Sequence, residues 1–286
     1  MFLSLYVATG LVQNASAESL LLVGDPGTGK SEQLRRFSEE PSGVIVGDIT
    51  VDGLREAMSD DTRPYPLRHI IMPEFGRIFG HRDDTVRAVT GLLTSLMTRD
   101  AGKELAGPMG KRRLDFTGMQ VGVLAAMPTD VFNLHYKELL STGFLSRFTI
   151  LGVKRSAEER NRVMTNIFRG IRTDLRPFRC HLPLRPVVVR GGEKFGTQLQ
   201  DWVESWNPNA RERLAGHIVS LLPAVALLSG RHQVLAQDVE VLKLFQHYFE
   251  SLSLDGTGKV KLIPPLPTYS EFRYSLFLNG TSRRKK

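Results

Sequence analysis

Short apolar runs alternate with segments of helical periodicity in the first half of the chain. Ser19 to Val23 is such a run, His69 to Met72 and Gln120 to Ala126 resemble it, and another follows Arg147. Runs this short, bounded by glycine or proline, are typical of strands that are buried on both faces. Asp83 to Thr98 has apolar residues at helical spacing after an acidic start. This alternation predicts an α/β fold with a parallel sheet flanked by helices.

The second half of the chain is mainly helical in pattern. Helices are predicted for Arg155 to Arg172 and for residues 192–206, 209–228 and 236–252, with the aromatic residues of the last one in a core. A proline-rich segment interrupts this pattern and indicates a connector. The predicted units are a core over residues 1–175, a connector over 176–191, a small helical domain over 192–254, and an irregular basic tail over 255–286.

The N-terminal segment superficially imitates a secretion signal, because an apolar run precedes Ala15-Ser16-Ala17. It has no positively charged residues before the apolar run, and a nucleotide-binding pattern follows directly. We therefore expect a helix that packs on the following domain.

Composition narrows the class of protein. The 286 residues are 41% hydrophobic and 24% charged, which is ordinary for a globular protein and suggests neither a disordered chain nor a fibre. The single cysteine, Cys180, cannot form an internal disulfide, so we expect a reducing, cytoplasmic location. No apolar run approaches the roughly 20 residues that span a bilayer, so no membrane partner is expected. The net charge of +8 permits a polyanionic partner without identifying it, and Arg283 to Lys286 form a basic end typical of a solvated tail.

The first apolar run leads into a phosphate-binding pattern. Residues 24–31 fit G-x-x-x-x-G-K-[ST], and helix-forming residues follow. Glycines allow the backbone N–H groups to converge on phosphate oxygens, while the lysine reaches the β- and γ-phosphates and the serine hydroxyl is a ligand for Mg²⁺. The sequence therefore predicts a site for ATP and Mg²⁺. Its residues are Gly24, Asp25, Pro26, Gly27, Thr28, Gly29, Lys30 and Ser31.

An acid after a second strand would complete such a site, because the metal and the attacking water must be held opposite the lysine. Glu74 directly follows the strand of His69 to Met72 and Pro73, and we predict a catalytic and metal-binding role for it. The alternative is that Glu74 only caps a surface turn. Arg147, in GFLSRF, stands between a loop and a further strand and is either an ordinary ion-pair partner or a functional residue.

The motifs LLLVGDPGTGKS, TVDGLREAM, IIMPEFGRI, VLAAMP and GFLSRF occur in this order. Together they resemble the ATPase core of the minichromosome maintenance (MCM) helicases, a branch of the AAA+ ATPases, and the MCM-like ATPases of mobile elements. By motif the resemblance covers about residues 1 to 155, and it extends more faintly to about residue 250. It implies a three-layer P-loop core with a helical lid, and a ring or spiral homo-oligomer, expected to be a hexamer.

The resemblance also assigns roles to residues. Arg147 corresponds to an arginine finger that acts on the nucleotide of a neighbouring subunit. A lid arginine that senses nucleotide corresponds to Arg211 or Arg213, between which the sequence does not decide. The segment 99–118 corresponds to a DNA-contacting hairpin, with a solvated surface loop as the alternative. The candidate phosphate contacts on it are Lys103, Lys111, Arg112 and Arg113.

Two positions depart from the pattern of these relatives. Pro73 stands where an acid helps to hold Mg²⁺, and Met127 stands where an asparagine senses the γ-phosphate. At Pro73, either Ser31 and waters suffice to hold the metal, or the alignment shifts by one position so that Glu74 holds the metal and no base follows it. Thr129 is the nearest polar substitute for that asparagine. These departures support nucleotide binding more strongly than fast hydrolysis.

The expected function is an ATP-hydrolysing, MCM-like DNA motor or an accessory ATPase in DNA replication, which acts with DNA and with a replication partner protein. Two alternatives stay open: a helicase loader or binding module that ATP switches with weak hydrolysis, and an AAA+ protein remodeller.

Overall fold

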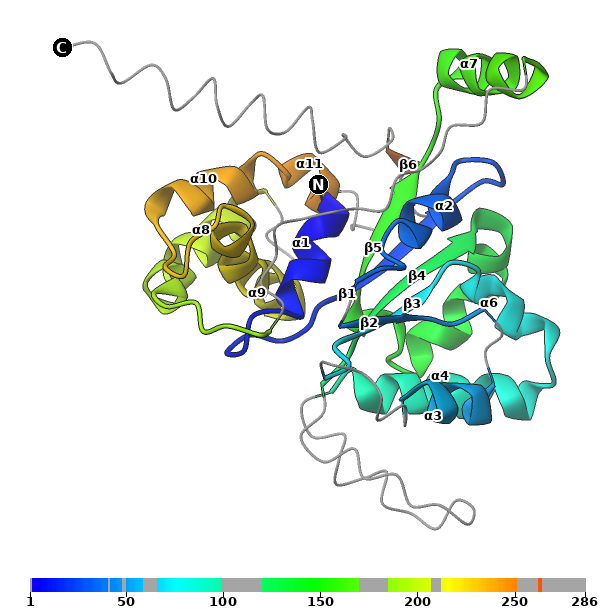
Figure 1. Ribbon diagram of the computed structural model, residues 1–286, viewed down its shortest axis with the longest axis horizontal. Coiled ribbons are helices and arrows are strands. Elements are labelled where there is room, and N and C mark those ends of the chain that lie inside the picture. Colours follow the sequence, from blue (N-terminus) through cyan, green and yellow to red (C-terminus); the bar gives the residue numbers. More distant parts are fainter. Residues whose placement is uncertain are drawn as a thin grey trace.

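A parallel β-sheet forms the centre of the molecule (Figure 1). The computed structural model describes residues 2–40, 42–47, 50–58, 66–98, 120–169, 185–206, 212–250 and 262–263. The strands are β1 (Ser19–Gly24), β2 (Gly43–Ile45), β3 (His69–Met72), β4 (Gly122–Pro128), β5 (Phe148–Val153) and β6 (Leu262–Ile263). Their order in the sheet is β2-β3-β4-β1-β5-β6, and every neighbouring pair is parallel.

The strand order creates a crevice at the carboxyl end of β1. Gly24, the last residue of β1, pairs with Pro128 on β4 and with Val153 on β5, so these strands end at the same level. The chain leaves β1 toward β2 on one side, whereas it leaves β4 toward β5 on the other side. Ligands of parallel α/β sheets bind where neighbouring connections diverge in this way.

Helices cover both faces of the sheet. Side chains alternate along each strand, so an apolar strand presents apolar side chains on both faces, and both must be buried. Leu20 and Leu22 belong to one hydrophobic cluster, whereas Leu21 and Val23 belong to the other. The second cluster includes residues of α3 (Val51–Met58), α4 (Asp83–Leu96) and α6 (Thr129–Ser141), and of the 3₁₀ turns η1 (Phe75–Gly80) and η2 (Leu145–Arg147). The predicted α/β fold with a parallel sheet is confirmed.

The first cluster joins the sheet to a group of helices from both ends of the described chain. Helix α1 (Phe2–Thr9) packs against α9 (Glu212–Leu228), and Figure 1 shows it among the later helices. The other members are α2 (Lys30–Arg35), η3 (Gly192–Phe195), α8 (Gly196–Trp206), α10 (Ala236–Lys243) and α11 (Gln246–Glu250). The N-terminal segment is thus a buried helix, as predicted, and its packing partners include a helix from the second half of the chain.

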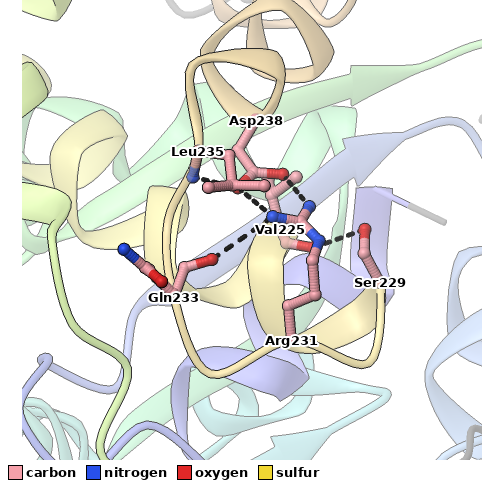
Figure 2. A network of polar contacts seen from close by, with 6 residues as sticks. All are labelled: Val225, Ser229, Arg231, Gln233, Leu235 and Asp238. Carbon is pink, nitrogen blue, oxygen red and sulfur yellow. Dashed lines mark hydrogen bonds and ion pairs between the residues drawn. The ribbon is translucent and has the colours of Figure 1, made fainter.

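A buried ion pair fixes the turn between α9 and α10 (Figure 2). The Asp238 side chain is 1% exposed and accepts hydrogen bonds from both terminal nitrogens of Arg231, of which the Nη1 contact to Oδ2 is 2.9 Å. The backbone N–H of Leu235 donates to the same Oδ2 at 2.8 Å, and Arg231 Nη1 also donates to the Gln233 carbonyl at 3.2 Å. The carboxylate therefore caps α10 and neutralises the arginine at once.

Several predicted boundaries differ from the structure. The strand expected from Gln120 to Ala126 is β4, which both begins and ends two residues later, at Gly122 and Pro128. Helix α7 (Ala157–Phe168) begins after Arg155, which was expected inside it. The helix predicted over residues 236–252 is interrupted between α10 and α11. Its aromatic residues Phe245, Tyr248 and Phe249 are buried, as expected.

Among the helices that the structure describes, none combines the length and apolar character needed to cross a bilayer.

Candidate functional site

Glycines shape the loop between β1 and α2. Gly27 and Gly29 have φ of 78° and 83°, in the left-handed region that only glycine adopts without strain. A Cβ on Gly24 would lie 2.2 Å from the carbonyl oxygen of Val153, so a side chain there would collide with the neighbouring strand. Each of these three glycines is therefore required by the local backbone, and the loop predicted from residues 24–31 does connect a strand to a helix.

Lys30 is folded onto this loop. Its Nζ donates hydrogen bonds to the carbonyl oxygens of Gly24 and Asp25 at 2.5 and 2.8 Å, and to Thr28 Oγ1 at 3.1 Å. Burial lowers the pKa of Lys30, while the charges of Asp25 and Asp130 act in the opposite direction. An ammonium held on neutral carbonyls keeps most of its charge available for an anion in the same cradle.

Ser31 connects the loop to the acidic turn after β3. Its Oγ donates a 2.7 Å hydrogen bond to the backbone carbonyl of Pro73. Proline cannot ligate a metal through its side chain, but its carbonyl contacts the hydroxyl that is expected to bind Mg²⁺. Glu74 follows immediately, so the structure brings Lys30, Ser31 and Glu74 to one edge of the sheet.

These residues line a cleft with a volume of about 490 Å³. This size is within the usual range for small-molecule sites. One wall comes from the loop of residues 24–31, called the P-loop below after its sequence pattern, and another comes from the turn after β3. The lining residues are Pro26, Gly27, Gly29, Lys30, Ser31, Glu32, Pro73, Glu74, Gly76, Arg77, Ala126, Met127 and Pro128.

Both carboxylate oxygens of Glu74 are engaged by arginines. Oε1 lies 2.8 Å from Arg35 Nη2, and Oε2 lies 2.5 Å from Arg77 Nη2. The Glu74 side chain is 32% exposed, so water still reaches it. Sequence reasoning assigned no role to either arginine, although Arg77 lies within the IIMPEFGRI motif.

The end of β4 presents apolar atoms to the cleft. Met127 is fully buried in the core below it. Thr129 begins α6 and does not line the cleft, and its Oγ1 is buried with no hydrogen-bond partner in the described part of the chain. Asp130, one residue later, is close enough to influence the charge of Lys30 and is a polar group that the sequence analysis did not assign.

Arg147 lies at the opposite edge of the sheet from the P-loop. It immediately precedes Phe148, which pairs with Ser19 at the start of β1, whereas the P-loop follows Gly24 at the other end. Five strand residues separate these ends by roughly 17 Å. Its Nη1 donates to the Gly143 carbonyl at 2.6 Å, and its Nε donates to Thr98 Oγ1 at 3.2 Å. Arg147 is therefore not part of the cleft of its own chain.

Other predicted residues are not described by the structure. Arg211 and the candidate DNA contacts Lys103, Lys111, Arg112 and Arg113 lie outside the described residues. Arg213 is in α9, but its side chain is not described.

Arg155 is a further cation beside the P-loop that sequence reasoning missed. A Cβ placed on Gly29 would lie 2.6 Å from Arg155 Nη2. The residue follows β5, and the parallel pairing of β5 with β1 brings it there. No local signal marked it, because the helical pattern included Arg155 and its position depends on the pairing of β5 with β1.

The donors present fit a phosphate chain better than a protein-bound metal. Across the described ranges, no group of three or more His, Cys, Asp and Glu side chains could hold a metal ion. A Mg²⁺ that arrives with ATP takes most of its ligands from phosphates and water. Ser31 and Glu74 are the side chains that would contact it.

Neither a scan against protein-family models nor a search of the curated proteins finds a match to this chain.

Proposed function

We propose that the chain binds ATP with Mg²⁺ at residues 24–31 and is an AAA+ ATPase of the MCM type. The observation that carries this proposal is the loop between β1 and α2, in which Gly27 and Gly29 are left-handed and Lys30 sits in the loop. Such loops bind phosphates with converging N–H groups and with a lysine. The position of the loop at a topological switch point of a parallel sheet adds to the argument.

The terminal phosphate belongs on the β3 side of the loop, where Lys30, Ser31 and Glu74 line the cleft. Mg²⁺ bound with the nucleotide neutralises phosphate charge during transfer. Lys30 would release Gly24 and Asp25 to contact phosphate oxygens, and Ser31 would hold the metal. Glu74 would orient the attacking water once its arginine contacts loosen.

Arg147 in this proposal serves a neighbouring subunit. Its distance from the P-loop of its own chain leaves it no role there, whereas a subunit packed head to tail could receive it beside its ATP. A ring or spiral homo-oligomer, such as a hexamer, satisfies this requirement. The order of motifs supports DNA as the substrate, with residues 99–118 as the contacting segment.

A second candidate is a binding module that ATP occupancy switches, with slow hydrolysis. The two arginine contacts of Glu74 and the apolar Met127 at the end of β4 favour it. Both carboxylate oxygens are occupied by guanidinium groups, so neither can orient a water until one of these contacts breaks.

A titration tests nucleotide binding directly. The protein is titrated with a fluorescent ATP analogue in Mg²⁺, in parallel with Lys30→Ala and with Lys194→Ala, an exposed lysine on η3. We expect saturable binding by the wild type and by Lys194→Ala, and at least a roughly tenfold loss for Lys30→Ala. If the wild type does not saturate, the proposal is wrong.

An ATPase assay then separates the two candidates. If the protein is a DNA motor, single-stranded DNA should raise ATP turnover at low salt, and this effect should weaken as the salt concentration rises. If the protein is a binding module switched by ATP, ATP turnover should be slow and unchanged by DNA. ATP should then promote assembly, which light scattering measures.

A further inference from the structure

The chain leaves β5 beside the P-loop, and Arg155 lies at this exit. It lies two residues beyond Val153, the end of β5, and Val153 pairs with Gly24 at the end of β1. These two strand ends lie so close together that a Cβ on Gly24 would be 2.2 Å from the Val153 carbonyl oxygen. The position of the Arg155 backbone relative to the P-loop is therefore set by strand pairing rather than by a long loop.

The guanidinium of Arg155 lies directly on Gly29. A Cβ at Gly29 would be 2.6 Å from Nη2 and 3.5 Å from Cζ of Arg155. The guanidinium thus occupies the space that a side chain at position 29 would need. Gly29 is the residue that precedes Lys30, so this cation is next to the N–H groups that cradle phosphate.

The cation has no acidic partner in the part of the chain that the structure describes. Among the residues that the structure describes, none forms an ion pair or a hydrogen bond with the Arg155 side chain. Glu159, an acid in the first turn of α7, is engaged elsewhere: its Oε2 accepts from the Ser156 backbone N–H at 2.9 Å. Ser156 Oγ in turn accepts from the Glu159 N–H at 3.1 Å, which closes a capping box. A half-buried guanidinium with five N–H donors is thereby left for an external acceptor.

Strand order decides which part of a nucleotide Arg155 faces. Glu74 follows β3 and Arg155 follows β5, and β1 with its P-loop lies between these strands. Arg155 does not line the cleft that contains Lys30 and Glu74. The terminal phosphate is assigned to that cleft, so Arg155 faces the inner phosphates on the other side of the loop.

We propose that Arg155 binds the α- and β-phosphates of a nucleoside di- or triphosphate held by the P-loop of the same chain. This inference rests on the proposed nucleotide site. Because ATP and ADP share these phosphates, Arg155 strengthens the binding of both and does not sense the γ-phosphate. It is a binding residue in cis, in contrast to Arg147, which is proposed to act between subunits.

The test compares dissociation constants for Mg·ATP and Mg·ADP by calorimetry. The variants are Arg155→Ala and Arg155→Gln, and the matched control is Lys154→Ala, which removes the adjacent exposed cation. We expect both Arg155 variants to bind each nucleotide roughly tenfold more weakly, by similar factors, and the control to bind as the wild type. Thermal melting of each variant verifies that it is folded.

The outcomes distinguish this inference from the proposed function. If the wild type binds both nucleotides and the Arg155 variants bind them equally well, the role of Arg155 is refuted and the nucleotide site stands. A loss confined to ATP would place Arg155 at the γ-phosphate and overturn the assignment. If the wild type binds neither nucleotide, both proposals fall.

Discussion

The guanidinium of Arg35, in the last turn of α2, lies 2.8 Å from a carboxylate oxygen of Glu74, just after β3. Arg77 takes the other oxygen at 2.5 Å. The acid is thereby tied to the helix that follows the P-loop, and the Ser31 contact to Pro73 reinforces the same junction. Movement of α2 on nucleotide binding would change the contacts of the acid.

This pairing predicts opposite effects for two substitutions. Glu74→Gln should abolish ATP turnover while ATP still binds, because an amide cannot accept the proton of the attacking water. Arg35→Gln removes one restraint on the carboxylate, and turnover should rise several-fold. Steady-state phosphate release at saturating Mg·ATP measures both effects.

The stability of these variants should change little. The Arg35 side chain is 52% exposed, and exposed ion pairs contribute about 0–1 kcal/mol. Unchanged turnover in Glu74→Gln would remove Glu74 from the catalytic role. A loss of turnover in Arg35→Gln would mean that Arg35 itself serves the reaction.

The position of Arg147 predicts complementation between inactive subunits. Under the proposed function, Lys30→Ala would lack a working nucleotide site, and Arg147→Ala would lack the residue offered to a neighbour. In an equal mixture, roughly a quarter of the interfaces would pair an intact P-loop with an intact arginine, if subunits assemble at random. ATP turnover should therefore reappear on mixing.

The control for complementation is each variant assayed alone at the same total concentration. A mixture as inactive as its components would contradict the shared site. Wild-type turnover by Arg147→Ala alone would contradict it as well, because the residue would then be dispensable.

The fold was largely predictable because its strands are short, apolar and bounded by glycine or proline. The strand of Ser19 to Gly24 and the strand of His69 to Met72 are found where the periodicity places them. The P-loop was predictable for a different reason, since only glycine adopts the φ values of positions 27 and 29. Features set by the local backbone can therefore be predicted from the residue types alone.

Contacts between segments distant in sequence were not predictable. Arg155 reaches the P-loop only because β5 pairs with β1, and the helical pattern had placed it inside a helix. Arg35 and Glu74 are 39 positions apart, and no pattern in the sequence indicates that they form a pair. The α1 helix was expected to pack on the next domain, and only tertiary structure reveals α9 as a partner.

The buried ion pair of Arg231 and Asp238 predicts a large loss of stability when one partner is removed. Asp238→Ala would leave Arg231 without its counter-charge and would remove the acceptor for the Leu235 N–H. Breaking a buried pair costs about 3–5 kcal/mol, although Arg231 is 25% exposed, which favours the lower end. Urea denaturation followed by circular dichroism measures this loss.

The matched control for this pair is Lys243→Ala. Lys243 forms an ion pair with Glu240 at 2.9 Å on the same helix, but the Glu240 side chain is 65% exposed. A change below about 1 kcal/mol is expected there. If both substitutions cost the same, burial is not what makes the Arg231 pair important.

His69 predicts how stability depends on pH. The imidazole is fully buried, and Gly10 and Gly122 pack so closely that a Cβ on either would lie 2.5 and 2.8 Å from ring atoms. Burial, aided by the charge of Arg68, lowers the pKa of His69 from 6.5 to about 3. The native state therefore excludes a proton that the unfolded chain accepts below pH 6.5.

The sign of the effect follows from this difference. Between about pH 6.5 and pH 3 the unfolded state binds more protons than the native state, so stability falls as the pH is lowered. The contribution of His69 to the slope approaches about 1.4 kcal/mol per pH unit.

His69→Gln cannot bind a proton, so its free energy of unfolding should depend less steeply on pH over this range. His232→Gln, at an exposed position, should keep the wild-type slope. Urea denaturation at pH 7, 6, 5 and 4 compares the slopes. Parallel curves for wild type and His69→Gln would show that the native state binds a proton at His69 as readily as the unfolded chain does.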